Sequence, residues 1–232
     1  MKNKSVSVAE RNSTVNTINR NGVSTALSPT RHSSFSILHF SFFILHFSFI
    51  ILLSGCFNEP EPAYKSVPAE NRVYLSDKAL KALPEVNAKA DYLNLDRNQL
   101  EKVDGVEKLT ALKWLRLNDN KLTALPDLKP LAELRRIYLK NNKFDKVPET
   151  LKDLPALTDV ELSGNPIREI PDWLVAKKGL KNVSFSRTMV TALPKDLSGW
   201  QSLQSLQLGD LHIAPEEMAR IRKALPNVAI VF

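Results

Sequence analysis

The sequence predicts an α/β fold in the form of a right-handed solenoid, with a parallel β-sheet on one side and short helical or 3₁₀ segments on the other. From residue 90 onward, a pattern of leucine, asparagine and proline recurs with a period of 22 or 23 residues. Within each repeat, apolar and polar residues alternate over a stretch just long enough for one strand. A constant period of this size is typical of a solenoid, because each unit buries its apolar face against the next.

The first predicted element is a degenerate strand at Val73–Leu75, followed by a helical turn at Ser76–Leu83 that would close the start of the core. The full pattern, L-x-x-L-x-L-x-x-N-x-L-x-x-L-P, then begins in the segment ADYLNLDRNQLEKV (90–103). Its strand residue is matched once in every later repeat. The aligned strand residues are Leu93, Leu115, Ile137, Val160, Val183, Leu206 and Val228.

After each strand, the Leu-Pro pair turns the chain back along the other side of the solenoid, because proline cannot continue a strand. Pairs of large apolar residues then return to the core on a short helix or 3₁₀ turn. They are Leu128/Leu131, Leu151/Leu154 and Leu197/Trp200. Near the C-terminus, Pro215–Leu225 has proline at a helix start, acidic residues in the first turn and basic residues near the end, which favours a helix. The segment NVAIVF (227–232) follows as a last strand.

This pattern resembles that of the leucine-rich repeat family over residues 73–232, within a predicted domain of residues 71–232. The resemblance implies a leucine-rich-repeat solenoid of seven to eight strands with a concave sheet. It also implies that a structural ladder of asparagines pairs with backbone groups of neighbouring coils. The ladder residues are Asn98, Asn120, Asn142 and Asn165.

The chain before this domain changes composition twice. Residues 1–33 are rich in Ser, Asn and Thr and are expected to be a disordered arm. A translation start chosen too far upstream would also account for this stretch. Residues 34–56 are apolar, and residues 57–70 form a linker rich in Pro and Glu. Residues 1–55 hold five basic residues and one acidic residue, which gives +4 of the net charge of +7. The charge is therefore not concentrated on the repeats, and it does not indicate nucleic-acid binding.

The apolar stretch ends in Leu53-Ser54-Gly55-Cys56, and Cys56 is the single cysteine of the chain. These residues resemble the lipobox of bacterial lipoproteins. The resemblance implies cleavage before Cys56, lipidation of Cys56, and a membrane-anchored lipoprotein of the cell envelope, facing the periplasm or the surface. An uncleaved transmembrane helix is the alternative, because about 20 uncharged residues can span the hydrocarbon core. The long region before the apolar stretch departs from an ordinary signal peptide.

No catalytic constellation is visible, and we expect no enzyme activity, cofactor, metal site or small-molecule substrate. The sequence has no P-loop, no dinucleotide-binding glycine turn and no zinc motif. Asp159 and Glu161 lie two residues apart on one strand and could serve acid–base chemistry. Because nothing else converges on them, we interpret them as a solvated acidic patch.

The outward positions of the strands predict where a partner binds, and the partner class expected is a protein, bound by a monomer. The first half of this face is aromatic and basic, and the second half is small and neutral. Trp, Tyr and Arg dominate interface hot spots. The predicted concave-face binding residues are Tyr92, Trp114, Arg116, Arg136, Tyr138, Lys140, Asp159 and Glu161. The alternatives are a structural envelope protein without a specific ligand, in which these residues only solvate the sheet, and an enzyme acting through the acidic patch.

Overall fold

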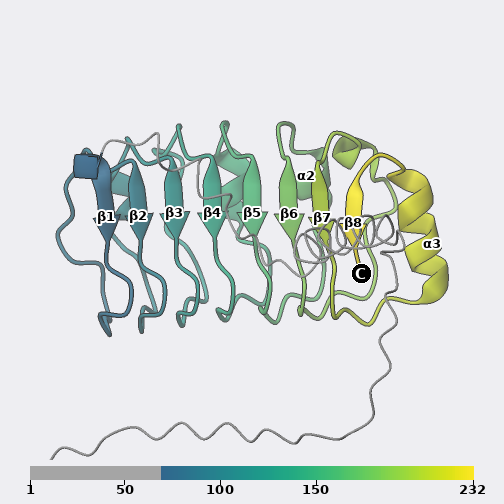
Figure 1. Cartoon of the computed structure of the whole chain (residues 1–232), viewed down its shortest axis with the longest axis horizontal. Coiled ribbons are helices and arrows are strands. Elements are labelled where there is room, and N and C mark those ends of the chain that lie inside the picture. The colour runs from purple at the N-terminus through teal and green to yellow at the C-terminus, as the bar shows by residue number, and fades with distance from the viewer. Residues whose placement is uncertain (1–68) are drawn as a thin grey trace, which may run out of the picture. The chain divides into compact units, whose positions relative to one another are not determined.

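The computed structural model describes residues 69–232, and these residues form one parallel sheet of eight strands. Each strand lies beside the strands that precede and follow it in sequence, as Figure 1 shows. The strands are β1 (Arg72–Tyr74), β2 (Tyr92–Asn94), β3 (Trp114–Arg116), β4 (Arg136–Tyr138), β5 (Asp159–Glu161), β6 (Asn182–Ser184), β7 (Ser205–Gln207) and β8 (Ala229–Val231). The predicted fold class is confirmed. The predicted residues 1–33, 34–56 and almost all of 57–70 lie outside the described part, and so does Cys56.

The register of the sheet places the central residue of each strand toward the core. Leu93 pairs with Leu115 and then Ile137, and this row continues to Leu206 with every member inaccessible to solvent. The prediction for the last strand is wrong by two residues, because Leu206 pairs with Ile230 and not with Val228. Helix α3 (Pro215–Ala224) precedes this strand and lengthens the return path, so that β8 begins later than the repeat period predicts.

Short helices and turns pack on the other side of the core. The helices are η2 (Ala69–Asn71), η3 (Val106–Lys108), η4 (Glu149–Asp153), α2 (Asp172–Ala176), η5 (Ser198–Trp200) and α3. Trp200 is fully buried, and its indole Nε1 donates to the carbonyl oxygen of Leu174 at 3.1 Å, which confirms it as a core residue. Among residues 69–232, no helix combines the length and the apolar character needed to cross a membrane.

The helical turn predicted at Ser76–Leu83 is absent, because this segment consists of turns and extended residues. Asp77 has a φ of 58° and Ala79 a φ of 52°, both in the left-handed region. These values are incompatible with a right-handed helical turn. The N-terminal end of the core is therefore covered by an irregular coil.

A left-handed turn follows the strands at one repeated position, and the sequence pattern did not reveal it. The residues there with positive φ are Asp77, Arg97, Asp119, Asn141, Gly164, Arg187 and Asp210. For a residue other than glycine this conformation costs roughly 1–2 kcal/mol. Six of these residues, all but Asp210, donate a backbone hydrogen bond to the next coil, as when Arg97 N–H donates to the Asn118 carbonyl at 2.9 Å. The turn directs the following asparagine under the strand.

Helix α3 is held against the preceding repeat by an ion pair that also binds the backbone. The Arg220 guanidinium donates to Glu217 at 2.7 Å and to the carbonyl oxygens of Leu193, Pro194 and Lys195 at 3.0–3.1 Å. Glu217 in turn accepts a hydrogen bond from the Leu193 N–H. These contacts, together with the fully buried Ile221, close the C-terminal end of the described core.

Candidate functional site

The sheet has an outer face, opposite the core, made by the first and last residue of each strand. Along β2 to β5 this face carries the residues predicted to bind a partner. In the first row, Tyr92 pairs with Trp114, then Arg136, then Asp159. In the second row, Asn94 is followed by Arg116, Tyr138 and Glu161. The structure therefore brings the predicted residues together on adjacent strands.

Six side chains on this face form what we call the aromatic–arginine cluster. They are Tyr74, Tyr92, Trp114, Arg116, Arg136 and Tyr138. The ring of Tyr92 lies 5.3 Å from that of Tyr74 and meets the ring of Trp114 edge-on at 5.9 Å. The Arg136 guanidinium lies over the Trp114 ring at 4.8 Å. Such cation–π contacts orient the arginine on the face of the ring.

Arg116 and Arg136 are each held twice, once by an aromatic ring and once by a carboxylate. Arg116 lies 5.0 Å over Tyr138 and donates from Nε to Asp96 at 2.8 Å. Arg136 Nε lies 3.6 Å from Oδ2 of Asp159, and Oδ1 of the same carboxylate accepts from the Asn182 amide at 2.6 Å. The two guanidinium groups therefore have defined positions along the sheet.

Three rings of the cluster are nearly buried although they lie on the outer face of the sheet. Tyr92, Trp114 and Tyr138 lie outside the hydrophobic core cluster, yet only 4%, 7% and 3% of their surfaces are exposed. Contacts with their neighbours along the sheet account for part of this burial. Tyr74, at 52% exposed, is the open member of the cluster.

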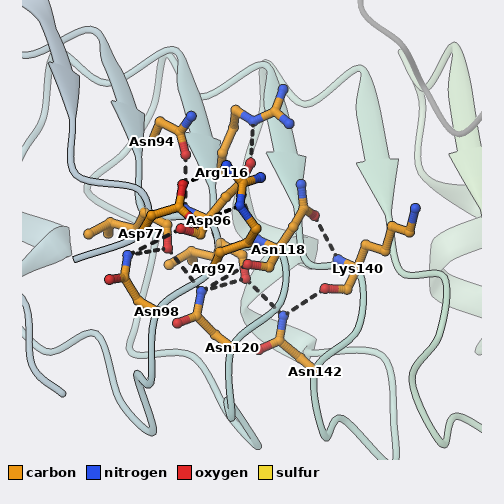
Figure 2. A network of polar contacts seen from close by, with 12 residues as sticks. Asp77, Asn94, Asp96, Arg97, Asn98, Arg116, Asn118, Asn120, Lys140 and Asn142 are labelled. Carbon is orange, nitrogen blue, oxygen red and sulfur yellow. Dashed lines mark hydrogen bonds and ion pairs between the residues drawn. The ribbon is translucent and has the colours of Figure 1, made fainter. Parts of the chain in front are cut away.

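A polar ladder follows the ends of the strands, and sequence reasoning missed it (Figure 2). The Asp96 carboxylate accepts the backbone N–H of Asn118 at 2.8 Å, and the Asn118 side chain accepts that of Lys140 at 2.9 Å. Each side chain thus pairs with a backbone group one repeat further on. Lys140 has no acceptor atom, so the ladder cannot continue there.

Glu161 supplies the acceptor that Lys140 lacks. Its carboxylate accepts the N–H of Ser163 at 2.8 Å, and it is only 4% exposed. Asp159 is also buried, at 7% exposed, so the expectation of a solvated acidic patch is wrong. Burial raises the pKa of Glu161, while hydrogen bonds from Ser163 and Ser184 and the charge of Lys140 oppose that rise. The sequence signal for this role is that Lys140, which has no acceptor atom, occupies the position held by Asp96 and Asn118 in the preceding repeats.

The asparagine ladder lies below the sheet edge, and each member binds two coils (Figure 2). The Asn120 amide donates to the carbonyl oxygens of Leu95, Leu117 and Asn118 at 3.0–3.1 Å. Its side-chain oxygen accepts the N–H of Leu100 at 3.1 Å. Asn98, Asn142 and Asn165 make equivalent contacts. In the next repeat Thr188 takes this position and donates only to the Phe185 carbonyl.

Comparison with known families is consistent with this geometry. A family model described as leucine rich repeat matches residues 110–167. The fold is a leucine-rich-repeat solenoid. Among solved structures, an internalin from Listeria monocytogenes is similar, with a TM-score of 0.49 and 23% identity over 62% of this chain. The similar region is 48% of the internalin chain, so this chain spans about half of that length. A comparison with curated proteins gave no match.

The solenoid shows no group of three or more His, Cys, Asp and Glu residues arranged for a metal ion within residues 69–232. Its carboxylates on the outer face are instead engaged by arginines and backbone N–H groups. The chemistry that this face offers is therefore recognition by aromatic rings, guanidinium groups and oriented amides.

Substitution of Glu161 tests whether its oxygen or its charge matters. Glu161→Ala should lower the free energy of unfolding by about 1–3 kcal/mol, since the Ser163 N–H loses its acceptor. Glu161→Gln keeps an acceptor and removes a buried charge, so we expect it to be at least as stable as the wild type at pH 7.

The difference in the free energy of unfolding between the wild type and Glu161→Gln should also depend on pH, in a defined direction. A carboxyl with a raised pKa holds its proton more tightly in the folded state than in the unfolded chain. Wild-type stability relative to Glu161→Gln should therefore fall as the pH rises from the ordinary glutamate value through the raised one. Urea unfolding at pH 4 and pH 7 measures this. A constant difference between the two proteins would contradict the assignment.

Proposed function

We propose that this leucine-rich-repeat solenoid is a binding module that recognises a protein partner through the outer face of β2 to β5. The observation that carries the proposal is the aromatic–arginine cluster, in which rings and guanidinium groups outside the core hold one another in fixed positions. Prearranged side chains reduce the entropy lost on binding. Trp, Tyr and Arg are also the residues that contribute most to protein interfaces.

The composition of the rest of the face supports a localised site. Along β6 and β7 the outer positions are Asn182, Ser184, Ser205 and Gln207, which are small or neutral. An envelope protein without a specific ligand would not require aromatic rings and arginines to be gathered on four adjacent strands. The proposal accordingly places the partner over β2 to β5, with the module acting as a monomer and without enzyme activity.

Two substitutions test the site. Trp114→Ala and Arg136→Ala should each weaken partner binding by at least about 1–2 kcal/mol, since each removes one half of the cation–π pair. The partner would first be captured from envelope extract of the native host with the wild-type chain, and its affinity for each purified variant then measured by calorimetry.

Gln207→Ala is the matched control, because Gln207 lies on the same face three strands from Arg136. It should leave the affinity unchanged. Equal affinity of the wild type, Trp114→Ala and Arg136→Ala, with unchanged melting temperatures, would place the binding site elsewhere on the solenoid.

We further propose that the module is anchored in the cell envelope by a lipid on Cys56. The support is Leu53-Ser54-Gly55-Cys56, followed by a segment rich in proline and glutamate that can serve as a tether. Two or three acyl chains anchor a protein stably where one does not.

Cys56→Ala should abolish this anchoring. We expect the variant to keep residues 1–55 and to leave the detergent phase, whereas the wild type should begin at Cys56 and carry the mass of its acyl chains. Intact mass spectrometry of both proteins from the native host measures this. A wild-type protein that retains residues 1–55 would rule out the lipoprotein.

A further inference from the structure

A hollow on the helical side of the solenoid has no part in the function proposed above. It extends across three successive coils, from Leu125 in the first, past Pro148 in the second, to Trp173 in α2. Its volume is about 400 Å³, within the range of roughly 300–1,000 Å³ that is typical of ligand pockets. The helical side packs against the core opposite the outer face of the sheet, so this hollow is separate from the aromatic–arginine cluster.

Trp173 stands at a position where the repeat does not require an aromatic residue. At the local period of 23, the same position holds Thr150 in the preceding coil, Asp127 in the coil before that and Asp196 in the next coil. The core residue of this turn of α2 is Leu174, which is fully buried. Trp173 packs against the edge of the core and remains partly exposed, and it lines the hollow. Packing of the solenoid alone therefore does not explain the tryptophan.

Two carboxylates that line the same hollow are not engaged by other groups. Neither the Glu149 nor the Glu169 side chain makes a hydrogen bond or an ion pair within the part of the chain that the structure describes. The other charged residues of the lining are Asp145 and Lys146, so the described lining has a net charge of −2. The hollow thus combines an aromatic ring, apolar surface and uncompensated negative charge.

The outer face of this protein shows twice which group a ring and a carboxylate hold between them. Arg136 lies over the Trp114 ring at 4.8 Å while its Nε is 3.6 Å from Asp159, and Arg116 is held by a ring and a carboxylate in the same way. A guanidinium suits both partners, because its flat face stacks on aromatic rings and its edge donates to carboxylates. The hollow offers a ring and two carboxylates but, among the described residues that line it, no arginine.

We propose that this hollow binds an arginine side chain of a partner polypeptide. The guanidinium stacks on Trp173 and pairs with Glu149 and Glu169, and an apolar neighbour of that arginine packs on Leu125 and Pro148. The negative charge of the lining favours a cation, and its apolar part favours a cation that has an apolar residue beside it. The solenoid therefore carries a second recognition site, opposite in charge to the arginines of the aromatic–arginine cluster.

The test is a titration of the full chain with the tripeptide acetyl-Arg-Leu-Arg-amide, followed by tryptophan fluorescence. The chain has three tryptophans, so the Trp173 signal is the difference between each protein and its Trp173→Phe counterpart. In the wild type, this signal should change in a saturable way. Glu149→Gln/Glu169→Gln keeps the shape of both side chains and removes their charge, so it should raise the half-saturating concentration at least about fivefold.

Two kinds of control accompany the titration. Glu85→Gln/Glu101→Gln removes the same charge at two exposed positions outside the hollow and should leave the half-saturating concentration unchanged. The tripeptide with citrulline in place of each arginine is neutral and of nearly the same shape, and it should give no saturable change. Arginine amide, which lacks the apolar neighbour, should require a several-fold higher concentration than the tripeptide.

Equal half-saturating concentrations for the wild type and Glu149→Gln/Glu169→Gln would overturn the proposal, and so would a Trp173 signal that does not saturate. Saturation by the citrulline tripeptide at the same concentration would overturn the guanidinium as the recognised group. Saturation by arginine amide at the same concentration would overturn the polypeptide in favour of a small cation. None of these substitutions lies on the outer face of β2 to β5, so the result is separate from that of the proposed function.

Discussion

Replacing Asn120 or Asn142 by alanine should lower the free energy of unfolding by about 1–3 kcal/mol for each change. The main cause is the loss of one acceptor. The N–H of Leu100 is bound by the Asn120 side chain and the N–H of Leu122 by that of Asn142, both at 3.1 Å. The carbonyl groups are less sensitive to a single change, because the ladder shares them. Thermal or urea unfolding of the purified chain measures the effect.

The double variant Asn120→Ala/Asn142→Ala should be less stable than the sum of the two single changes predicts. The Leu117 carbonyl accepts from both Asn120 and Asn142, at 3.1 and 2.9 Å, so that either one alone still pairs it. Removing both leaves a further buried acceptor unpaired, which costs about 1–3 kcal/mol more.

The pair Asn98→Ala and Asn165→Ala is the matched control for this cycle. Asn98 donates to the carbonyls of Leu75, Leu95 and Asp96, and Asn165 to those of Leu139, Leu162 and Ser163, so they share none. Their effects should add. Additive effects in both cycles, or melting temperatures unchanged by the single changes, would contradict the ladder as a source of stability.

Gly199→Ala should destabilise the protein by about 1–3 kcal/mol or more, since it forces two backbone segments apart. Gly199 lies in η5, where a Cβ would overlap the carbonyl oxygen of Val175 in α2 and lie 2.9 Å from its carbonyl carbon. The Ala176 Cα would be 3.2 Å away. Backbone atoms of a packed helix cannot rotate aside as a side chain can. The glycine is therefore required by close approach and not by its own conformation, because its φ is not in the left-handed region.

Gly164→Ala gives the comparison with a flexible neighbour. Its Cβ would overlap Oδ1 of Asn141, at the end of a side chain that can turn away. It would still carry the cost of a φ of 69°, roughly 1–2 kcal/mol. In urea unfolding, Gly199→Ala should therefore have a lower free energy of unfolding than Gly164→Ala. The reverse order would show that η5 moves away from α2 easily.

Most of the fold was predictable because the same pattern of apolar and polar residues recurs in successive repeats. The period of the leucines predicts the inward row from Leu93 to Leu206, and the family pattern identifies Asn98, Asn120, Asn142 and Asn165. The prediction is wrong where repetition ends. At Ser76–Leu83 no preceding repeat fixes the coil, and before β8 the length of α3 shifts the register by two residues.

For the candidate site, the sequence predicted which residues lie on the outer face, but not how exposed or how paired they are. Alternation along the strands predicts that Trp114 lies between Tyr92 and Arg136, and the ring contacts agree. Alternation carries no information on exposure, and the solvated acidic patch that we expected at Asp159 and Glu161 is buried in the structure. It also gives no indication that Glu161 provides the acceptor that Lys140 lacks. The N–H that requires this acceptor belongs to Ser163, one repeat after Lys140.

The sequence by itself determined the solenoid, its period, its core residues and the polarity of the outer face, because these follow from side-chain periodicity within one repeat. Only the tertiary structure decided which groups are buried and paired. The left-handed turns at Arg97 and Asp119 and the carbonyl shared by Asn120 and Asn142 depend on atoms 20 or more residues away. Glu161 accepts from an N–H two residues away, but this acceptor is needed because Lys140, one repeat earlier, has none. Each is set by the stacking of one coil on the next, at distances that no single repeat specifies.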